Sequence, residues 1–192
     1  MNNILGIGVG ALIIGVLLGS FALPRMWRGV DYGDKIMAGN VDRHFIEEMI
    51  PHHEGAIAMA KLALEKSKRP EMLKLAAEII KAQEQEIVDM RAWYEVWFGV
   101  TVPADSTGSM GGMGHGAGMH MGGMEGDLAA LAAAADFDRE LVRQMIPHHE
   151  MAVMMARMLA AGTSRSEMKQ LAANIIASQS SEIVLMRGWL NN

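Results

Sequence analysis

The sequence predicts an all-α protein: a four-helix bundle made of two tandem helical hairpins, preceded by an N-terminal transmembrane helix. The first observation is an internal repeat. Residues 41–93 align with residues 137–189 without a gap, and about half of the aligned pairs are identical. The second is helical spacing of apolar residues within each copy. The third is a short break in each copy, which favours two antiparallel helices joined by a turn. At 192 residues and 51% hydrophobic, the chain can bury a core.

The N-terminal segment is apolar and uncharged over residues 4–23. A helix of about 20 residues spans the hydrocarbon core of a bilayer. Residues 1–23 are therefore predicted to be a membrane anchor, with a cleaved signal peptide ending near Ala22 as the alternative. Residues 24–39 are expected to form a juxtamembrane linker. It carries Arg25, Arg28 and Lys35, which by the positive-inside rule would place the rest of the chain in the cytoplasm.

Two helical hairpins follow, at residues 40–98 and 128–192. In the first, helices are expected over residues 40–66 and 70–98, with Pro70 in the first turn of the second helix. In the second, helices are expected over residues 136–161 and 167–190. Gly162 suits a position just past a helix end, and Ser164 with Glu167 has the spacing of a capping box.

The second helix of each hairpin carries a stripe with alternating four-three spacing, which is typical of a face that packs in a bundle. Its members are Met72, Ala76, Ile79, Gln83, Glu86, Met90, Trp93 and Trp97, and then Met168, Ala172, Ile175, Gln179, Glu182, Met186 and Trp189. The methionines of this stripe are interpreted as core. The glutamine and glutamate of each stripe are polar, and burying a carboxylate is costly unless it has a partner. We expect the core to supply such a partner. These four polar residues are also candidates for groups that hydrogen-bond to the ligands of a metal site.

Residues 99–127, between the hairpins, are predicted to be a flexible linker because glycine, methionine and histidine dominate the segment. A solvated loop gains nothing from exposed methionine, so metal binding is the favoured interpretation and low-complexity drift is the alternative. The candidate ligands in the linker are Met110, Met113, His115, Met119, His120, Met121 and Met124.

The most specific motif, Met-Ile-Pro-His-His-Glu, occurs at residues 49–54 and again at 145–150. On a helix the first methionine, the first histidine and a later methionine share one face. The proline before the histidines removes a helical hydrogen bond and is expected to loosen the local packing. The candidate metal ligands are Met49, His52, His53 and Met59 in the first copy, and Met145, His148, His149, Met151, Met154 and Met155 in the second. Together with Met158, the second copy is expected to form a thioether-rich wall.

This ligand set indicates copper. Thioethers combined with imidazoles select Cu(I), for which Ag(I) is a possible surrogate. The chain has no cysteine, which suits a copper protein in an oxidising compartment that uses methionine and histidine instead. We therefore expect the soluble part on the extracytoplasmic, periplasmic side, against the positive-inside rule. A net charge of −5 excludes a broad nucleic-acid-binding surface.

Two other classes of function remain open. A ferritin-like dimetal oxidase would use Glu47, Glu48, Glu54 and Glu86, but neither repeat has the Glu-x-x-His spacing of such bundles. A purely structural module would use the motif histidines as core residues bonded to Glu86 and Glu182. Salt bridges from Arg91 to Glu54 and from Arg187 to Glu150 are expected in either case.

The two motifs are each followed by a helix rich in methionine and alanine, and then by Gln-x-x-Glu-Ile-Val-x-Met-Arg-x-Trp. In this the chain resembles the bacterial domain-of-unknown-function family three hundred and five, which is grouped with ferritin-like bundles. The resemblance covers residues 40–98 and 136–192. It implies a ferritin-like four-helix bundle, exported, that binds copper through Met49, His52, His53 and Met59 and through Met145, His148, His149 and Met155, and that acts in copper resistance.

These inferences predict a methionine-rich, membrane-tethered copper protein without enzymatic activity, serving Cu(I) sequestration or chaperoning in copper homeostasis. Its expected partners are the metal ion, the membrane through residues 4–23, and a copper transporter or acceptor protein. No nucleic-acid partner is expected.

Overall fold

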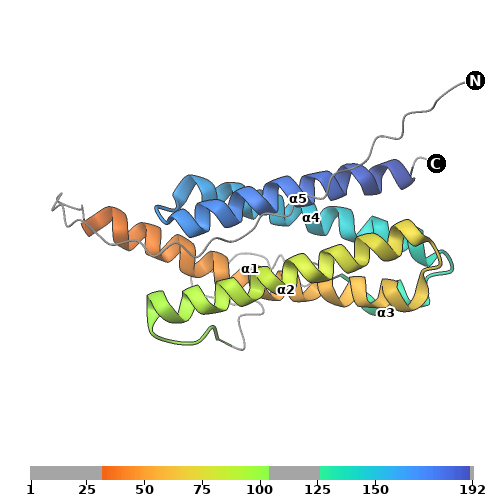
Figure 1. Ribbon diagram of the computed structural model, residues 1–192, viewed down its shortest axis with the longest axis horizontal. Helices are drawn as coiled ribbons and strands as arrows, with labels where there is room; N and C mark the ends of the chain where they lie inside the picture. The colour runs from red at the N-terminus through yellow and green to blue at the C-terminus, as the bar shows by residue number, and fades with distance from the viewer. Residues whose placement is uncertain (1–31, 104–125, 191–192) are drawn as a thin grey trace, which may run out of the picture. The chain divides into compact units, whose positions relative to one another are not determined.

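The computed structural model of the chain describes residues 32–103 and 126–190, with side chains from residue 40 onward. Within these ranges the chain is helical and forms a bundle of four long helices with one short helix beside it (Figure 1). The long helices are α1 (Tyr32–Lys66), α2 (Pro70–Phe98), α4 (Phe137–Gly162) and α5 (Ser166–Leu190). The all-α prediction is confirmed.

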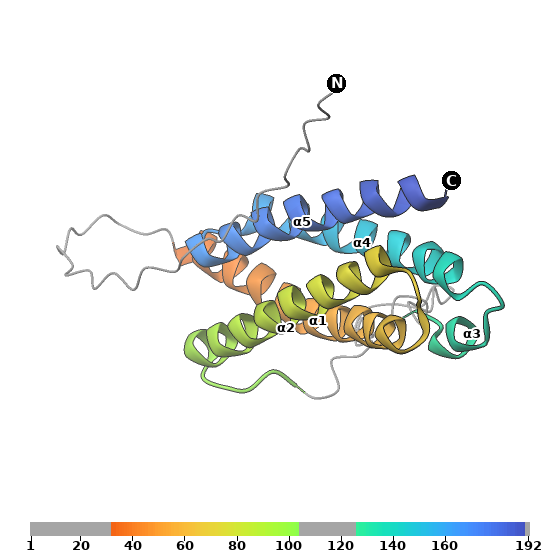
Figure 2. The same cartoon turned by 45° about the vertical axis from the view of Figure 1, so that its right-hand side comes forward.

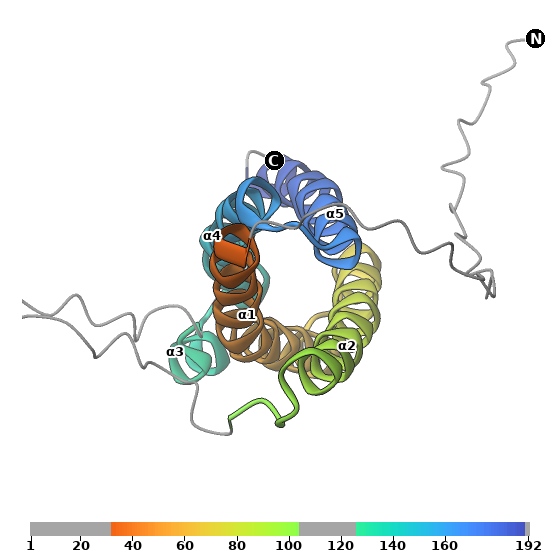
Figure 3. The ribbon, with the colours of Figure 1, turned by 90° about the vertical axis from the view of Figure 1, so that its left-hand side faces the viewer.

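The helices of each hairpin pack against each other, and α1 also packs against α4 of the other hairpin (Figure 2). Viewed along their length, the long helices form a ring in the order α1, α2, α5, α4 (Figure 3). This arrangement makes α1 and α4, which carry the two histidine motifs, direct neighbours across the interface between the hairpins.

Helix bounds follow the sequence to within one residue, with two exceptions, and Gly162 is the last residue of α4 rather than the residue just past its end. Helix α1 begins at Tyr32 rather than at Asn40, which fits the low cost of extending a helix once it has formed. The short helix α3 (Leu128–Ala133) was not expected. Asp127 initiates it, because its side chain accepts a hydrogen bond from the Ala130 backbone N–H.

The turn between α4 and α5 also differs from the expectation. The hydroxyl of Thr163, rather than that of Ser164, accepts a hydrogen bond from the Arg165 N–H at 3.1 Å. Ser67 does the same for Arg69 in the first hairpin, at 3.2 Å. The two turns are thus built alike, as the repeat implies.

Arg69 and Arg165, at equivalent positions of these turns, each reach into the other hairpin. The Arg165 guanidinium lies 4.1 Å from the ring centre of Trp97 and pairs with the fully buried Asp42 at 3.0 Å. The Arg69 guanidinium lies 5.6 Å from the ring centre of Trp189. These cation–π contacts join the hairpins at opposite ends of the bundle.

The stripe expected on α2 and α5 is the buried face of both helices. Met72, Ala76, Ile79, Gln83 and Met90 are buried on α2, as are Met168, Ala172, Ile175, Gln179 and Met186 on α5. No helix within the described ranges is both long and apolar enough to cross a bilayer. The anchor predicted at residues 4–23 lies outside these ranges.

Gly126 is a position where only glycine fits. Its φ is +71°, and a β-carbon there would lie 2.6 Å from the Met59 sulfur. Gly126→Ala is therefore expected to lower the free energy of unfolding by about 2 kcal/mol, through backbone strain and overpacking. Gly99→Ala is the matched control, because Gly99 has a φ of +70° and open space around it. In urea unfolding, Gly99→Ala should show only the cost of backbone strain. An equal loss of unfolding free energy in both variants would contradict the contact between Gly126 and Met59.

Candidate metal centre

The motif histidines lie in the middle of α1 and α4, and all four are buried. His53 and His149 are 0% exposed, and His52 and His148 are 5% and 6% exposed. Adjacent residues on a helix point about 100° apart. In each motif, therefore, one histidine faces the partner helix of its own hairpin and the other faces the opposite hairpin.

The histidines that face their own hairpin are bonded to carboxylates. His53 Nε2 donates to Glu86 Oε2 at 2.7 Å, and His149 Nε2 donates to Glu182 Oε2 at 2.7 Å. This pairing was expected of the motif histidines if they serve the core, and it is confirmed for His53 and His149 but not for His52 and His148. It is also how histidine ligands are commonly held, with one ring nitrogen donating to a carboxylate and the other left for a metal. The Nδ1 atoms of both histidines are buried and have no hydrogen-bond partner.

The other two histidines meet across the hairpin interface. The ring centres of His52 and His148 are 3.7 Å apart, and the ring planes are tilted by 39°. Both ring nitrogens of both side chains are buried without a hydrogen-bond partner. Burial, together with the charge of the neighbouring histidines, lowers the pKa of His52 to about 3 and that of His148 to about 2. Both imidazoles are therefore neutral at pH 7, with lone pairs available to a ligand.

Buried polar atoms without partners are uncommon in folded proteins and call for an explanation. Within the described part of this protein, six of the buried side-chain atoms without partners are ring nitrogens of the four motif histidines. Besides the ring nitrogens, the side-chain Oε1 atoms of Gln83 and Gln179, on the buried faces of α2 and α5, lack partners as well. Among these atoms the imidazole nitrogens are the donors that suit copper, whereas amide oxygens suit harder cations.

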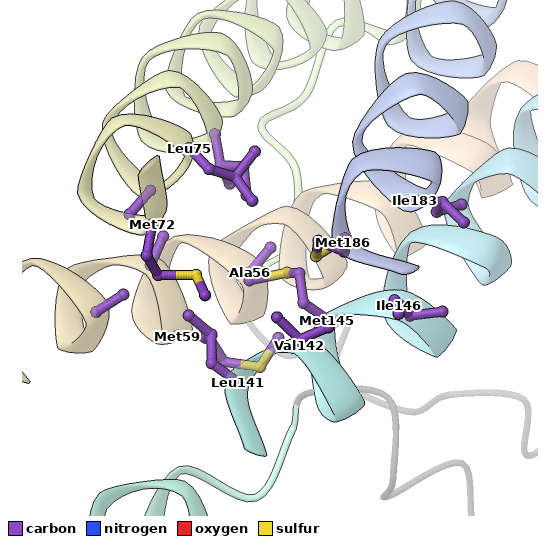
Figure 4. Packing of buried hydrophobic residues seen from close by; sticks show 14 of the residues in the cluster. Ala56, Met59, Met72, Leu75, Leu141, Val142, Met145, Ile146, Ile183 and Met186 are labelled. Carbon is purple, nitrogen blue, oxygen red and sulfur yellow. The ribbon is translucent and has the colours of Figure 1, made fainter. Parts of the chain in front are cut away.

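Methionines surround this centre in two clusters, each with one member from every long helix. The first methionine layer consists of Met59, Met72, Met145 and Met186 (Figure 4). The second methionine layer consists of Met49, Met90, Met155 and Met168. The members correspond pairwise in the internal repeat. Each layer thus combines two candidate ligands with two methionines that the sequence assigned to the core alone. The candidate ligands are Met49, Met59, Met145 and Met155. The sequence could not separate the two groups, because a ligand and a core residue have the same spacing on a helix.

The remaining candidates lie elsewhere. Met154 and Met158 are 48% and 67% exposed and line a surface groove of about 640 Å³ with Arg157 and Arg187, while Met151 is half-buried. The thioether-rich wall expected from the second motif therefore does not form, because α4 turns these side chains away from the histidines. The linker candidates Met110, Met113, His115, Met119, His120, Met121 and Met124 lie outside the described residues.

The carboxylates considered for a dimetal site are dispersed. Glu54 pairs with Arg91 at 2.9 Å, and Glu150 pairs with Arg187, as expected. Glu47 accepts hydrogen bonds from Arg43 and Tyr94, whose ring is fully buried, an arrangement that sequence reasoning missed. Within the described residues, no three side chains of His, Cys, Asp or Glu converge on a point where they could hold a metal ion. A metal at this centre would need thioether ligands beside the imidazoles.

Comparisons with known proteins identify the family and similar structures. The family model described as "Domain of unknown function (DUF305)" matches residues 42–190. The chain is 52% identical to CopM in the Cu(II)-bound form, with a TM-score of 0.70, over 79% of this chain and 96% of that one. CopM is also known in Cu(I)-bound and Ag-bound forms.

Two further proteins are similar to the chain. A DUF305 fragment from Deinococcus radiodurans is 27% identical, with a TM-score of 0.64, over 79% of this chain and 95% of that one. The uncharacterized protein L153 of Acanthamoeba polyphaga mimivirus is 39% identical over 51 residues, which span 27% of this chain and 34% of the viral protein.

Proposed function

The chain belongs to the DUF305 family, and we propose that it is an exported, membrane-tethered copper-binding protein that sequesters or delivers Cu(I). The similarity to CopM over nearly the whole of that chain supports copper as the cargo, since CopM binds Cu(I), Cu(II) and silver. The apolar, uncharged stretch of sequence at residues 4–23 and the absence of cysteine support an extracytoplasmic location, although Arg25, Arg28 and Lys35 favour the opposite orientation. A copper transporter or acceptor protein is the expected partner.

The observation that carries the proposal is the set of buried imidazole nitrogens without partners. His52 and His148 are neutral and adjacent across the hairpin interface, and their buried ring nitrogens have no hydrogen-bond partner. His53 and His149 are held by Glu86 and Glu182, and each leaves one nitrogen free.

We assign the metal to these nitrogens together with the thioether of Met49, which lies one helical turn before His52. A mixed imidazole and thioether set favours Cu(I) over harder cations. Glu86 and Glu182 orient the histidine rings, and their charge offsets that of a buried cation.

The linker is proposed as a second, looser copper store, with its methionines and histidines as ligands. Deleting residues 108–126 from the full-length protein in detergent should lower the number of Cu(I) ions bound in an anaerobic titration against a chromophoric chelator. The melting temperature should still rise with copper, because only ions held by the folded bundle stabilise it.

Two results would contradict this. An unchanged stoichiometry in the deletion variant would remove the linker from the proposal. A full-length protein that binds no Cu(I) would remove the copper function altogether and leave the motif histidines as core residues.

A further inference from the structure

The first methionine layer encloses a small cavity. Its volume is about 10 Å³, and three of its lining residues are methionines: Met72 from α2, Met145 from α4 and Met186 from α5. The other lining side chains are alanine, leucine and isoleucine. A space of this size holds about one water-sized particle, and an apolar lining gives a water molecule no hydrogen-bond partners. Among the lining side chains, the donor atoms are the thioether sulfurs of the three methionines.

The fourth methionine of the layer is engaged differently. The Met59 sulfur lies against Gly126, so close that a β-carbon on Gly126 would be 2.6 Å away. Met59 does not line the cavity. The thioether donors available there thus come from three helices, two of them in the second hairpin and one in the first.

We infer that this cavity is a separate binding site for one monovalent soft cation, Cu(I) or Ag(I), held by the sulfurs of Met72, Met145 and Met186. Thioethers are neutral and soft, so they favour a large, polarisable monovalent ion and give a hard, strongly hydrated cation nothing to replace its water. The inference rests on the proposed copper-binding function and adds a site that contains no histidine.

The internal repeat supports a site in this half of the bundle specifically. Every lining residue of the cavity has the same residue type at the equivalent position of the other half, with one exception. Leu141 lines the cavity, whereas its equivalent is Phe45, which is buried in the cluster that contains the second methionine layer. Phenylalanine is larger than leucine, so the second layer is expected to have less room for an ion. The same three methionines are thus present twice, but the space beside them differs.

This difference supplies the test. Ag(I) is titrated calorimetrically into the full-length protein in detergent, and the melting temperature is followed. Met72→Leu removes one sulfur at nearly constant volume. It should lose one bundle-bound Ag(I), seen as a smaller silver-induced rise in melting temperature and one equivalent less bound. Met168→Leu, the equivalent change in the other half, is the control and should match the wild type.

Leu141→Phe fills the cavity while keeping all three sulfurs and copies the residue found in the other half. It should weaken binding of that ion at least tenfold. Phe45→Leu should do the reverse and add one equivalent. These two variants keep the test decisive if the loss of a methionine impairs folding.

The outcomes separate the two proposals. If the wild type binds silver and copper but Met72→Leu and Leu141→Phe match Met168→Leu in stoichiometry and melting temperature, the cavity site is wrong and the copper function stands. If the wild type binds neither ion, both are wrong.

Discussion

Below about pH 6 the metal-free protein is expected to lose stability steeply, because two buried histidines resist protonation. The pKa values of His52 and His148 are lowered from 6.5 to about 3 and about 2 in the folded protein. In the unfolded chain both histidines take up protons near pH 6.5, whereas the folded protein excludes them. The stability is therefore complete above pH 6.5 and is lost as the pH falls toward the folded values.

The expected loss is large. One pKa unit corresponds to about 1.4 kcal/mol. At about pH 4.5 the two histidines together should cost on the order of 5 kcal/mol, comparable with the total stability of a small domain. Urea unfolding of the metal-free protein between about pH 7.5 and pH 4.5 measures this directly.

The control is a variant in which His52 and His148 are both replaced by leucine, which should flatten the pH dependence. A wild-type stability that stays constant down to about pH 4.5 would mean that these histidines are solvated or hydrogen-bonded.

The same double variant, His52→Leu with His148→Leu, is expected to gain stability at pH 7 and to lose its response to copper. Four buried ring nitrogens without partners are removed. Each unsatisfied buried polar group costs about 1–3 kcal/mol, so removing four of them should make the metal-free variant more stable by at least about 4 kcal/mol. In the wild type, bound copper should compensate for that cost, with about 4 kcal/mol of stabilisation at a free Cu(I) concentration a thousandfold above the dissociation constant.

The double variant is thus expected to gain stability without copper and to lose the stabilisation by copper. This combination distinguishes a metal centre from structural histidines. Urea unfolding with and without Cu(I), under anaerobic conditions, gives both numbers. If the histidines serve only the core, the double variant should be less stable than the wild type and should respond to copper as the wild type does. That pattern would overturn the proposed site.

Several features of the fold could be predicted from the sequence because they are local or repeated. Helix α2 runs from Pro70 to Phe98 as expected, since proline marks its first turn and the left-handed Gly99 follows its end. The pairing of His53 with Glu86 also follows from local pattern. Both residues lie in one hairpin, and a buried carboxylate needs a partner.

Other features needed the packed structure. Helix α3 was missed although Asp127 precedes a run of leucine and alanine, because the glycine-rich linker before it obscured the signal. Met154 and Met158 were wrongly placed in a thioether wall, since the sequence gives their spacing on α4 but not the side on which α1 and α5 lie.

By itself the sequence determined that this protein is a duplicated helical bundle with histidines and methionines at matching positions of its two halves, because periodicity and repetition are properties of the chain. Only the tertiary structure decided that His52 faces His148 rather than a carboxylate, that four methionines from four helices share a layer, and that Leu141 leaves a cavity beside three of them. These contacts join residues of different hairpins. Their geometry depends on how α1 and α4 pack and on the volumes of side chains far apart in the sequence.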